Sequence, residues 1–311
     1  MHLLLAESQD ATADMIVDGL GDRVVRVNND RHSDHEIQIT GQGFLVRDAY
    51  GREVNHQNLQ TLILRKFTRR PANATDEEIY AFREHTRGLE SLLDWVTWES
   101  PEKVPFNPFL IGQVSKFNMA AIAEKYFSVP SWSFSNKPSA CGLKEAVLKN
   151  LCGMPFSESA KTFSESKFVF VQPVDTNELA DGWPWYLQEK VEAKLDVTVA
   201  YIGGRCFGMQ LDRNTFEGVD WRKHIGTGTD KLWEHVVLPD WLKTKIDDYM
   251  KEMRLDYGRL DFLASKNDFS DIVFLEVNPH GQWGWMDLNK DKGIYAAMME
   301  FLTTPRPKLK R

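Results

Sequence analysis

Two short apolar segments near the C-terminal end of the chain, 257–263 and 273–283, each carry a single acidic residue. Both are predicted to be β-strands from their Leu, Val and Phe residues. Side chains in a strand alternate between two faces, so Glu276 and Asn278 point the same way. Asp261 lies in the other strand, which we expect to pair beside them. These oxygen ligands suit Mg²⁺ or Mn²⁺ shared with substrate phosphates.

The same alternation also fits a hairpin with one face in water, which is the alternative interpretation of Asp261 and Glu276. Asn278-Pro279, followed by Gly281, ends the second strand abruptly and places Asn278 at a sheet terminus. Ligand sites favour such positions. His280 lies beside this motif and is a candidate base, with a surface histidine as the alternative.

Two lysines stand in apolar surroundings. Lys116 lies near the start of a predicted helix, 112–126, and Lys149 ends a predicted strand, 146–149. A lysine at such a position is a suitable point charge for a nucleotide phosphate, although a solvated surface group is the alternative for each. The sequence contains neither GxxxxGK[ST] nor GxGxxG, so neither a P-loop nor a dinucleotide fold is indicated.

The segment 186–192 reads as a strand that ends in polar residues and leads into another strand. Such a connection can present backbone N–H and C=O groups to an adenine edge while a carboxylate holds the ribose. An ordinary charged turn is the alternative.

Alternating elements predict a mixed α and β protein. A strand, a helix and a strand within the first thirty residues suggest a βαβ unit with a parallel sheet, and a helix is expected over 75–98. Strands at 196–202 and 206–211 flank Gly203-Gly204, which predicts a hairpin. A helix at 239–254 and two strands then close the fold. The Pro-rich connector 101–108 suggests units at 1–104, 105–190 and 191–311.

Composition narrows the possible functions. The chain has 311 residues, 42 % of them hydrophobic, and a formal charge of −7, which argues against a general nucleic-acid binder. Cys141, Cys152 and Cys206 lack metal-site spacing and are expected to be reduced thiols. We find no secretory signal and no apolar run long enough for a membrane span, so a cytoplasmic protein without a membrane partner is expected.

Six motifs in order resemble the ATP-grasp superfamily: Asn107-Pro108 with Lys116, 147–151, 188–191, 196–204, 258–261 and 276–279. The resemblance covers about 105–302 and implies two α+β lobes clasping ATP, preceded by a small α/β domain. Three shorter matches, 62–71 (LILRKFTRRP), 219–222 (VDWR) and 278–283 (NPHGQW), resemble the ligases that make graspetides, including the microviridin maturases.

The resemblance implies a role for each motif residue. Lys116 and Lys149 would contact phosphates, Glu189 and Val191 would frame the adenine, and Gln188 and Asp196 belong to the same cofactor-binding set. Asp261, Glu276 and Asn278 would hold magnesium. Arg222 and the pair Arg69-Arg70 would face phosphate or an acidic substrate. The local basic cluster of Arg65, Lys66, Arg69 and Arg70 is a candidate docking surface for a carboxylate-rich peptide, with a solvated strand end as the alternative.

One position departs from the family pattern. The family usually has an arginine near the transferred phosphate, where this chain has Thr198 in Asp196-Val197-Thr198. Arg259 or Arg213 is a candidate substitute, and with Arg222 these form the predicted catalytic set. Loss of such a charge can slow phosphoryl transfer greatly.

Three functions therefore stay open. The first is a peptide ligase that activates a carboxylate as an acyl phosphate and joins Asp or Glu side chains of a precursor peptide to an amine or hydroxyl. The second is an amino-acid or protein-tail glutamate ligase with the same ATP and Mg²⁺ site. The third is a nucleotide-binding regulatory protein that has lost turnover. A homodimer is possible in each case.

Overall fold

The computed structural model describes residues 1–65, 67, 74–105, 115–143, 145–149, 151, 171–224 and 228–304. Several predicted positions lie outside this part of the chain: Lys66, Arg69, Arg70, Asn107, Pro108 and Cys152. The strands are β1 (His2–Ala6), β2 (Val24–Asn28), β3 (His35–Thr40), β4 (Gly43–Asp48), β5 (Glu53–Asn55), β6 (Thr61–Leu64), β7 (Trp132–Ser135), β8 (Ala146–Lys149), β9 (Gln172–Val174), β10 (Trp185–Glu189), β11 (Leu195–Ile202), β12 (Arg205–Asp212), β13 (Glu234–Val236), β14 (Tyr257–Ala264) and β15 (Val273–Asn278). The helices are α1 (Ala11–Leu20), α2 (Asp76–Glu99), α4 (Lys116–Ala123), α5 (Asp240–Glu252) and α6 (Ile294–Thr303).

The N-terminal unit contains the predicted βαβ arrangement. Strand β1 pairs in parallel with β2 on one side and with β6 on the other. Asp10 caps α1 by accepting the backbone N–H groups of Thr12 and Ala13, which would otherwise lack partners at the helix start. Strands β3, β4 and β5 form a separate antiparallel sheet. Thr75 and Glu78 start α2 with a reciprocal capping box.

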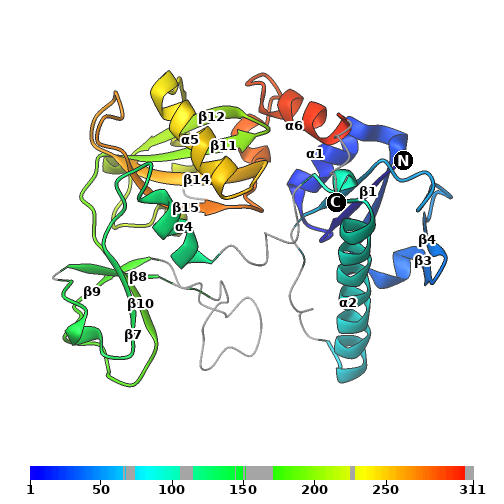
Figure 1. The fold of residues 1–311 in the computed structure, drawn as a ribbon, viewed down its shortest axis with the longest axis horizontal. Coiled ribbons are helices and arrows are strands. Elements are labelled where there is room, and N and C mark those ends of the chain that lie inside the picture. The colour runs from blue at the N-terminus through cyan, green and yellow to red at the C-terminus, as the bar shows by residue number, and fades with distance from the viewer. Residues whose placement is uncertain are drawn as a thin grey trace.

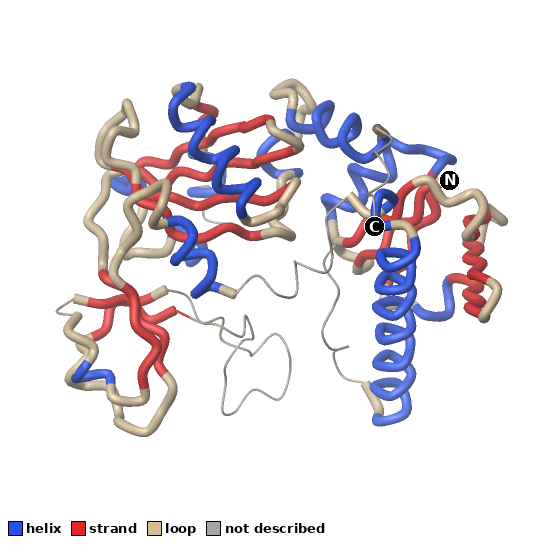
Figure 2. Tube along the Cα trace, in the orientation of Figure 1, coloured by secondary structure: helices blue, strands red, loops and turns tan. Residues whose placement is uncertain are grey.

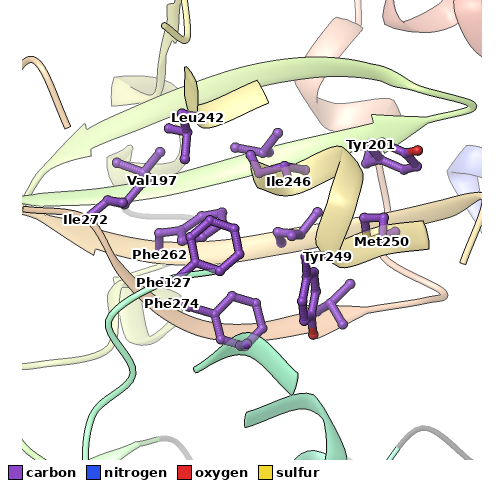
Figure 3. Close-up of a cluster of buried hydrophobic side chains, with 14 of the residues drawn as sticks. Phe127, Val197, Tyr201, Leu242, Ile246, Tyr249, Met250, Phe262, Ile272 and Phe274 are labelled. Carbon is purple, nitrogen blue, oxygen red and sulfur yellow. The ribbon is translucent and has the colours of Figure 1, made fainter. Parts of the chain in front are cut away.

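The largest sheet has the strand order β13-β12-β11-β14-β15 and is antiparallel throughout. Strands β11 and β12 form the predicted hairpin, and Gly203 and Gly204 turn it with φ angles of 53° and 90°. Such left-handed conformations are readily adopted by glycine. One face of the sheet is covered by α5 and by residues around α4, as Figure 3 shows for Phe127 and Tyr249 against Phe274.

The two ends of the chain share one hydrophobic core. Side chains of β1, α1 and β6 pack in the same cluster as side chains of β11, β12 and α6, and Figure 1 shows α1 beside α6. Gly284, in the turn 284–287 ahead of α6, lets α1 pack closely against that turn, since a Cβ there would lie 2.8 Å from the sulfur of Met15. Helix α6 was missing from the sequence prediction, which closed the fold with two strands.

A smaller antiparallel sheet has the order β7-β10-β8-β9 and stands apart from the large sheet (Figure 2). Aromatic contacts connect it to α4: the ring of Phe117 stacks on Trp132 at 5.1 Å and meets Tyr186 at 5.6 Å. Helix α4, predicted to belong to the second unit, also packs against β15 of the large sheet. Among the described residues, no helix is long and apolar enough to cross a membrane.

Candidate active site

Three polar side chains form a row across the large sheet. Thr198 on β11 pairs with Asp261 on β14, and Asp261 pairs with Glu276 on β15. Directly opposed residues of an antiparallel sheet share a face, so these three lie side by side. The other face of the same strands packs into the core through Val197, Leu260 and their neighbours.

A β-bulge lets Glu276 and Phe274, two residues apart in β15, lie on opposite faces of the sheet. Asp261 pairs with Glu276, but the next residue along β14, Phe262, pairs with Phe274, so β15 contributes one extra residue at that point. The extra residue reverses the alternation, and Phe274 is fully buried while Glu276 lies on the opposite face. Without the bulge, Glu276 and Phe274 would share a face, and the two could not lie on opposite sides of the sheet as they do.

Three cations surround Glu276. The Nζ atom of Lys116, at the start of α4, lies 2.9 Å from its Oε2 atom. Burial alone would raise the pKa of Glu276, but the charges of Lys116, Lys149 and Arg222 lower it to about 2. Burial lowers the pKa of Lys149 to about 8 against the opposing charge of Glu276. Lys116 therefore contacts Glu276 directly, while Lys149 and Arg222 act on it through their charges.

Asp261 has two other partners. Thr198 donates a hydrogen bond from its Oγ1 to Oδ1 of Asp261 at 2.8 Å, and Nη2 of Arg259 lies 3.4 Å from Oδ2. Thr198 therefore orients Asp261 without adding charge. Asn278 is exposed at the end of β15, where its Oδ1 accepts the backbone N–H of His280 at 3.0 Å. A carbonyl oxygen has a second lone pair, which this turn leaves available to a ligand.

These residues fit a divalent cation shared with phosphates. Like charges directly opposite each other in a sheet repel, so Asp261 and Glu276 are stable neighbours only with cations between or around them. Among the described residues, no group of three His, Cys, Asp or Glu side chains could hold a metal alone. Two carboxylates and an amide oxygen, completed by ligand phosphates, match the preference of Mg²⁺.

Two further arginines are held by carboxylates. Arg213 lies 2.7 Å from Asp196, whose pKa burial raises to about 6 against the attraction of Arg213. Arg222 forms a two-pronged pair with Asp220, and it is also coupled electrostatically to both Glu276 and Asp261. Asp220 belongs to the 219–222 match, but it was given no role there, because nothing in Val-Asp-Trp-Arg distinguishes it from a surface acid.

The predicted adenine segment lies at the end of β10. Gln188 is buried, Val191 is partly buried, and Glu189 accepts the backbone N–H of Ser131 at 3.2 Å. Sequence reasoning missed Tyr186, which pairs with Lys149 across β10 and β8 and is 5 % exposed. Burial and the charge of Glu276 raise the pKa of Tyr186 to about 12, so its hydroxyl stays protonated beside the cluster.

Arg65 does not lie on the predicted docking surface. Its side chain is 1 % exposed and its Nε atom lies 3.1 Å from Asp10, which is itself buried. The strand end was predicted to be accessible because it is followed by basic residues, but β6 ends inside the junction with the large sheet. Burial and the charge of Arg65 lower the pKa of His280 to about 4, which keeps that imidazole neutral.

Comparison with known proteins adds information on the fold. No protein-family model matches the sequence, and neither does any curated protein. Among solved structures, the chain is similar to a RiPP-associated ATP-grasp ligase from Chryseobacterium gregarium, with a TM-score of 0.80 at 19 % identity. RiPPs are ribosomally synthesised, modified peptides, and that structure is a complex with ADP and a leader and core peptide. That match covers 99 % of this chain and 97 % of the other.

Two other ligases match over similar lengths. The macrocyclase MdnC from Microcystis aeruginosa, bound to precursor peptide MdnA, has a TM-score of 0.77 at 18 % identity and covers 97 % of this chain and 99 % of its own. The ATP-grasp ligase PsnB, complexed with a variant of its minimal precursor, Mg and ADP, has a TM-score of 0.68 at 17 % identity, with 97 % of each chain covered. The chain therefore has the ATP-grasp fold of these structures, as its motifs predicted.

Proposed function

We propose that this protein is an ATP- and Mg²⁺-dependent ligase that activates a carboxylate as an acyl phosphate and joins it to an amine or hydroxyl. The observation that carries the proposal is the pair Asp261 and Glu276, placed side by side on one sheet face and surrounded by Lys116, Lys149 and Arg222. A fold alone does not determine a function, so the argument depends on this arrangement.

Each group has a distinct task in that reaction. Asp261, Glu276 and Asn278 would hold Mg²⁺, which supplies charge neutralisation at the transferred phosphoryl group. Lys116 lies on α4 and Lys149 on β8, so they approach the site from different elements. We assign both lysines to the remaining phosphate oxygens. Thr198 keeps Asp261 in its orientation through the 2.8 Å hydrogen bond. Tyr186 remains protonated and serves as a hydrogen-bond donor next to Lys149.

Lys116 must exchange partners when a nucleotide binds. It now pairs with Glu276 at 2.9 Å, so its ammonium group neutralises the carboxylate that would hold the metal. With Glu276 engaged by a metal, Lys116 would be released to bind the phosphates. The site thus keeps its charges balanced in both states.

The substrate that best fits this proposal is a carboxylate-rich precursor peptide. Structurally similar ligases were solved with leader, core or precursor peptides, and their likeness extends over nearly the whole chain. Asp or Glu side chains of the peptide would be activated and joined to Lys, Ser or Thr side chains of the same peptide.

Mass spectrometry tests this function. The protein is incubated with ATP, Mg²⁺ and the carboxylate-rich peptide encoded beside its gene, and we expect release of ADP and loss of one water per bond formed. Glu276→Gln should abolish both, whereas Glu252→Gln, which alters an acid on the surface of α5, should leave them unchanged. Mass gain by amino-acid units would indicate an amino-acid ligase instead, and nucleotide binding without ADP release would indicate a regulatory protein.

A further inference from the structure

Asp220 is a buried acid that gathers an unusual number of N–H groups. It is 4 % exposed, and its Oδ1 and Oδ2 atoms accept Nε and Nη2 of Arg222 at 2.8 Å and 2.6 Å. Oδ1 also accepts the backbone N–H of Arg222 at 3.1 Å, and Oδ2 accepts the backbone N–H of Val171 at 2.9 Å. Asp220 therefore holds both the backbone N–H and the guanidinium of Arg222, and through Val171 it connects them to the residues that lead into β9.

The segment that carries Asp220 is anchored on both sides. Arg213 binds Asp196 on β11 at 2.7 Å and also reaches the carbonyl oxygen of Val219 at 3.4 Å. On the other side, the ring of Trp221 packs against Trp233 at 5.3 Å, within the core shared by the two chain ends. Asp220, between these anchors, has a defined position relative to β11 and β14.

Arg222 senses the charges of Glu276 and Asp261, and its segment is anchored through Arg213 and Val219 to Asp196, two residues from Thr198 on β11. Its pKa is raised first by the hydrogen bonds to Asp220 and then by the negative charges of Asp220, Glu276 and Asp261. The other two candidate arginines have direct partners of their own, since Arg213 pairs with Asp196 and Arg259 lies against Asp261. The pair with Asp220 uses Nε and Nη2, so the Nη1 edge of the guanidinium is directed away from Asp220.

We propose that Asp220 is a positioning residue that holds Arg222 so that its Nη1 edge meets the transferred phosphoryl group. The inference rests on the proposed function and deepens it. Arg222, positioned in this way, supplies the positive charge that Thr198 does not. Because Asp220 also binds the backbone of Val171, the position of Arg222 is connected to that of the smaller sheet.

A substrate-free measurement tests this role. Calorimetry gives the affinity of the protein for Mg²⁺·ADP with and without aluminium fluoride, which mimics a phosphoryl group in transit. We expect aluminium fluoride to tighten binding to the wild type. Arg222→Gln and Asp220→Asn should each lose about 10- to 100-fold of that tightening, the range typical of partners that orient a functional group, while Mg²⁺·ADP affinity changes by less than about threefold.

The double variant separates positioning from a purely structural role. If Asp220 acts through Arg222, adding Asp220→Asn to Arg222→Gln causes no further loss. If Asp220 only anchors Val171, the same loss recurs in both backgrounds and the inference is wrong. Asp212→Asn is the matched control, because among the described residues the Asp212 carboxylate accepts only the backbone N–H of Asn214. It should bind like the wild type.

Arg222→Lys keeps the inference testable if Asp220→Asn does not fold. The Arg222 side chain is 45 % exposed, so lysine is accommodated, and it keeps the charge but lacks the two-pronged geometry. A loss like that of Arg222→Gln supports the inference, and wild-type tightening contradicts it. A wild type that shows no tightening also contradicts it. A wild type that binds no Mg²⁺·ADP at all refutes the proposed function itself.

Discussion

Replacing Glu276 with Gln removes the anion shared by Lys116 and Lys149 while keeping the size of the side chain. Burial alone would raise the pKa of Glu276, but the two lysines and Arg222 lower it from 4.5 to about 2. At ~1.4 kcal/mol per pH unit, this difference corresponds to roughly 3 kcal/mol. Lys149, with a pKa of about 8, can lose its proton in the variant and relieve part of the cost. We therefore expect Glu276→Gln to lower the free energy of unfolding at pH 7 by ~1–3 kcal/mol.

The same substitution predicts a pH dependence. The folded-state pKa of Glu276 lies below the unfolded-state value, so its contribution to stability is complete above pH 4.5 and is lost as the pH falls towards 2. Wild type and Glu276→Gln should differ by the full amount at pH 7 and by less than about half of it at pH 3.

Urea unfolding at pH 7, 5 and 3, followed by both circular dichroism and tryptophan fluorescence, measures these differences. Glu252→Gln is the control, because Glu252 contacts Lys125 and Tyr126 on the surface, where such pairs contribute little. Equal stability of wild type and Glu276→Gln at pH 7, or a difference that does not change with pH, would refute the assignment of Glu276 as the anion of a three-cation cluster.

Three other substitutions have defined expectations. Wild-type affinity for Mg²⁺·ADP should fall as the pH rises through 8, because Lys149 loses its charge there. Lys149→Met should bind Mg²⁺·ADP weakly at every pH, and calorimetry from pH 6.5 to 9.5 measures both affinities. Asp10→Ala leaves Arg65 as a buried charge without its carboxylate and should cost ~3–5 kcal/mol in urea unfolding, and a cost below ~1 kcal/mol would contradict the buried pair. A Cβ on Gly281 would lie 2.5 Å from Cβ of Arg259, so Gly281→Ala should cost ~1–3 kcal/mol, measured as a lower thermal midpoint.

Local patterns predicted the elements that carry the site. The run from Tyr257 to Leu263 and the residues around Glu276 formed the expected strands, and Gly203-Gly204 formed the expected hairpin turn. These features depend on alternation and turn chemistry, which a sequence displays directly. The side-by-side placement of Asp261 and Glu276 followed from the same pattern.

Contacts between segments far apart in the chain could not be predicted from local sequence patterns. The basic run after β6 suggested an accessible Arg65, but Asp10, 55 residues earlier, binds it in the interior. The bulge in β15 that lets Phe274 reach the core, while Glu276 lies on the other face, has no signal of its own, because it depends on how β14 pairs. Asp220 gained importance only through Arg222 and Val171. Each of these depends on tertiary pairing that local residue patterns do not encode.

We propose that Asp261 and Glu276 together hold one divalent ion at a bound nucleotide. Crystals grown with ADP and Mn²⁺, and measured at the manganese absorption edge, test it directly through anomalous scattering. We expect a peak ~2.2 Å from a carboxylate oxygen of Asp261 and of Glu276, with Lys116 turned from Glu276 towards the phosphates. An anomalous peak elsewhere, or bound nucleotide without manganese at these two carboxylates, would contradict the assignment of Asp261 and Glu276 as metal ligands.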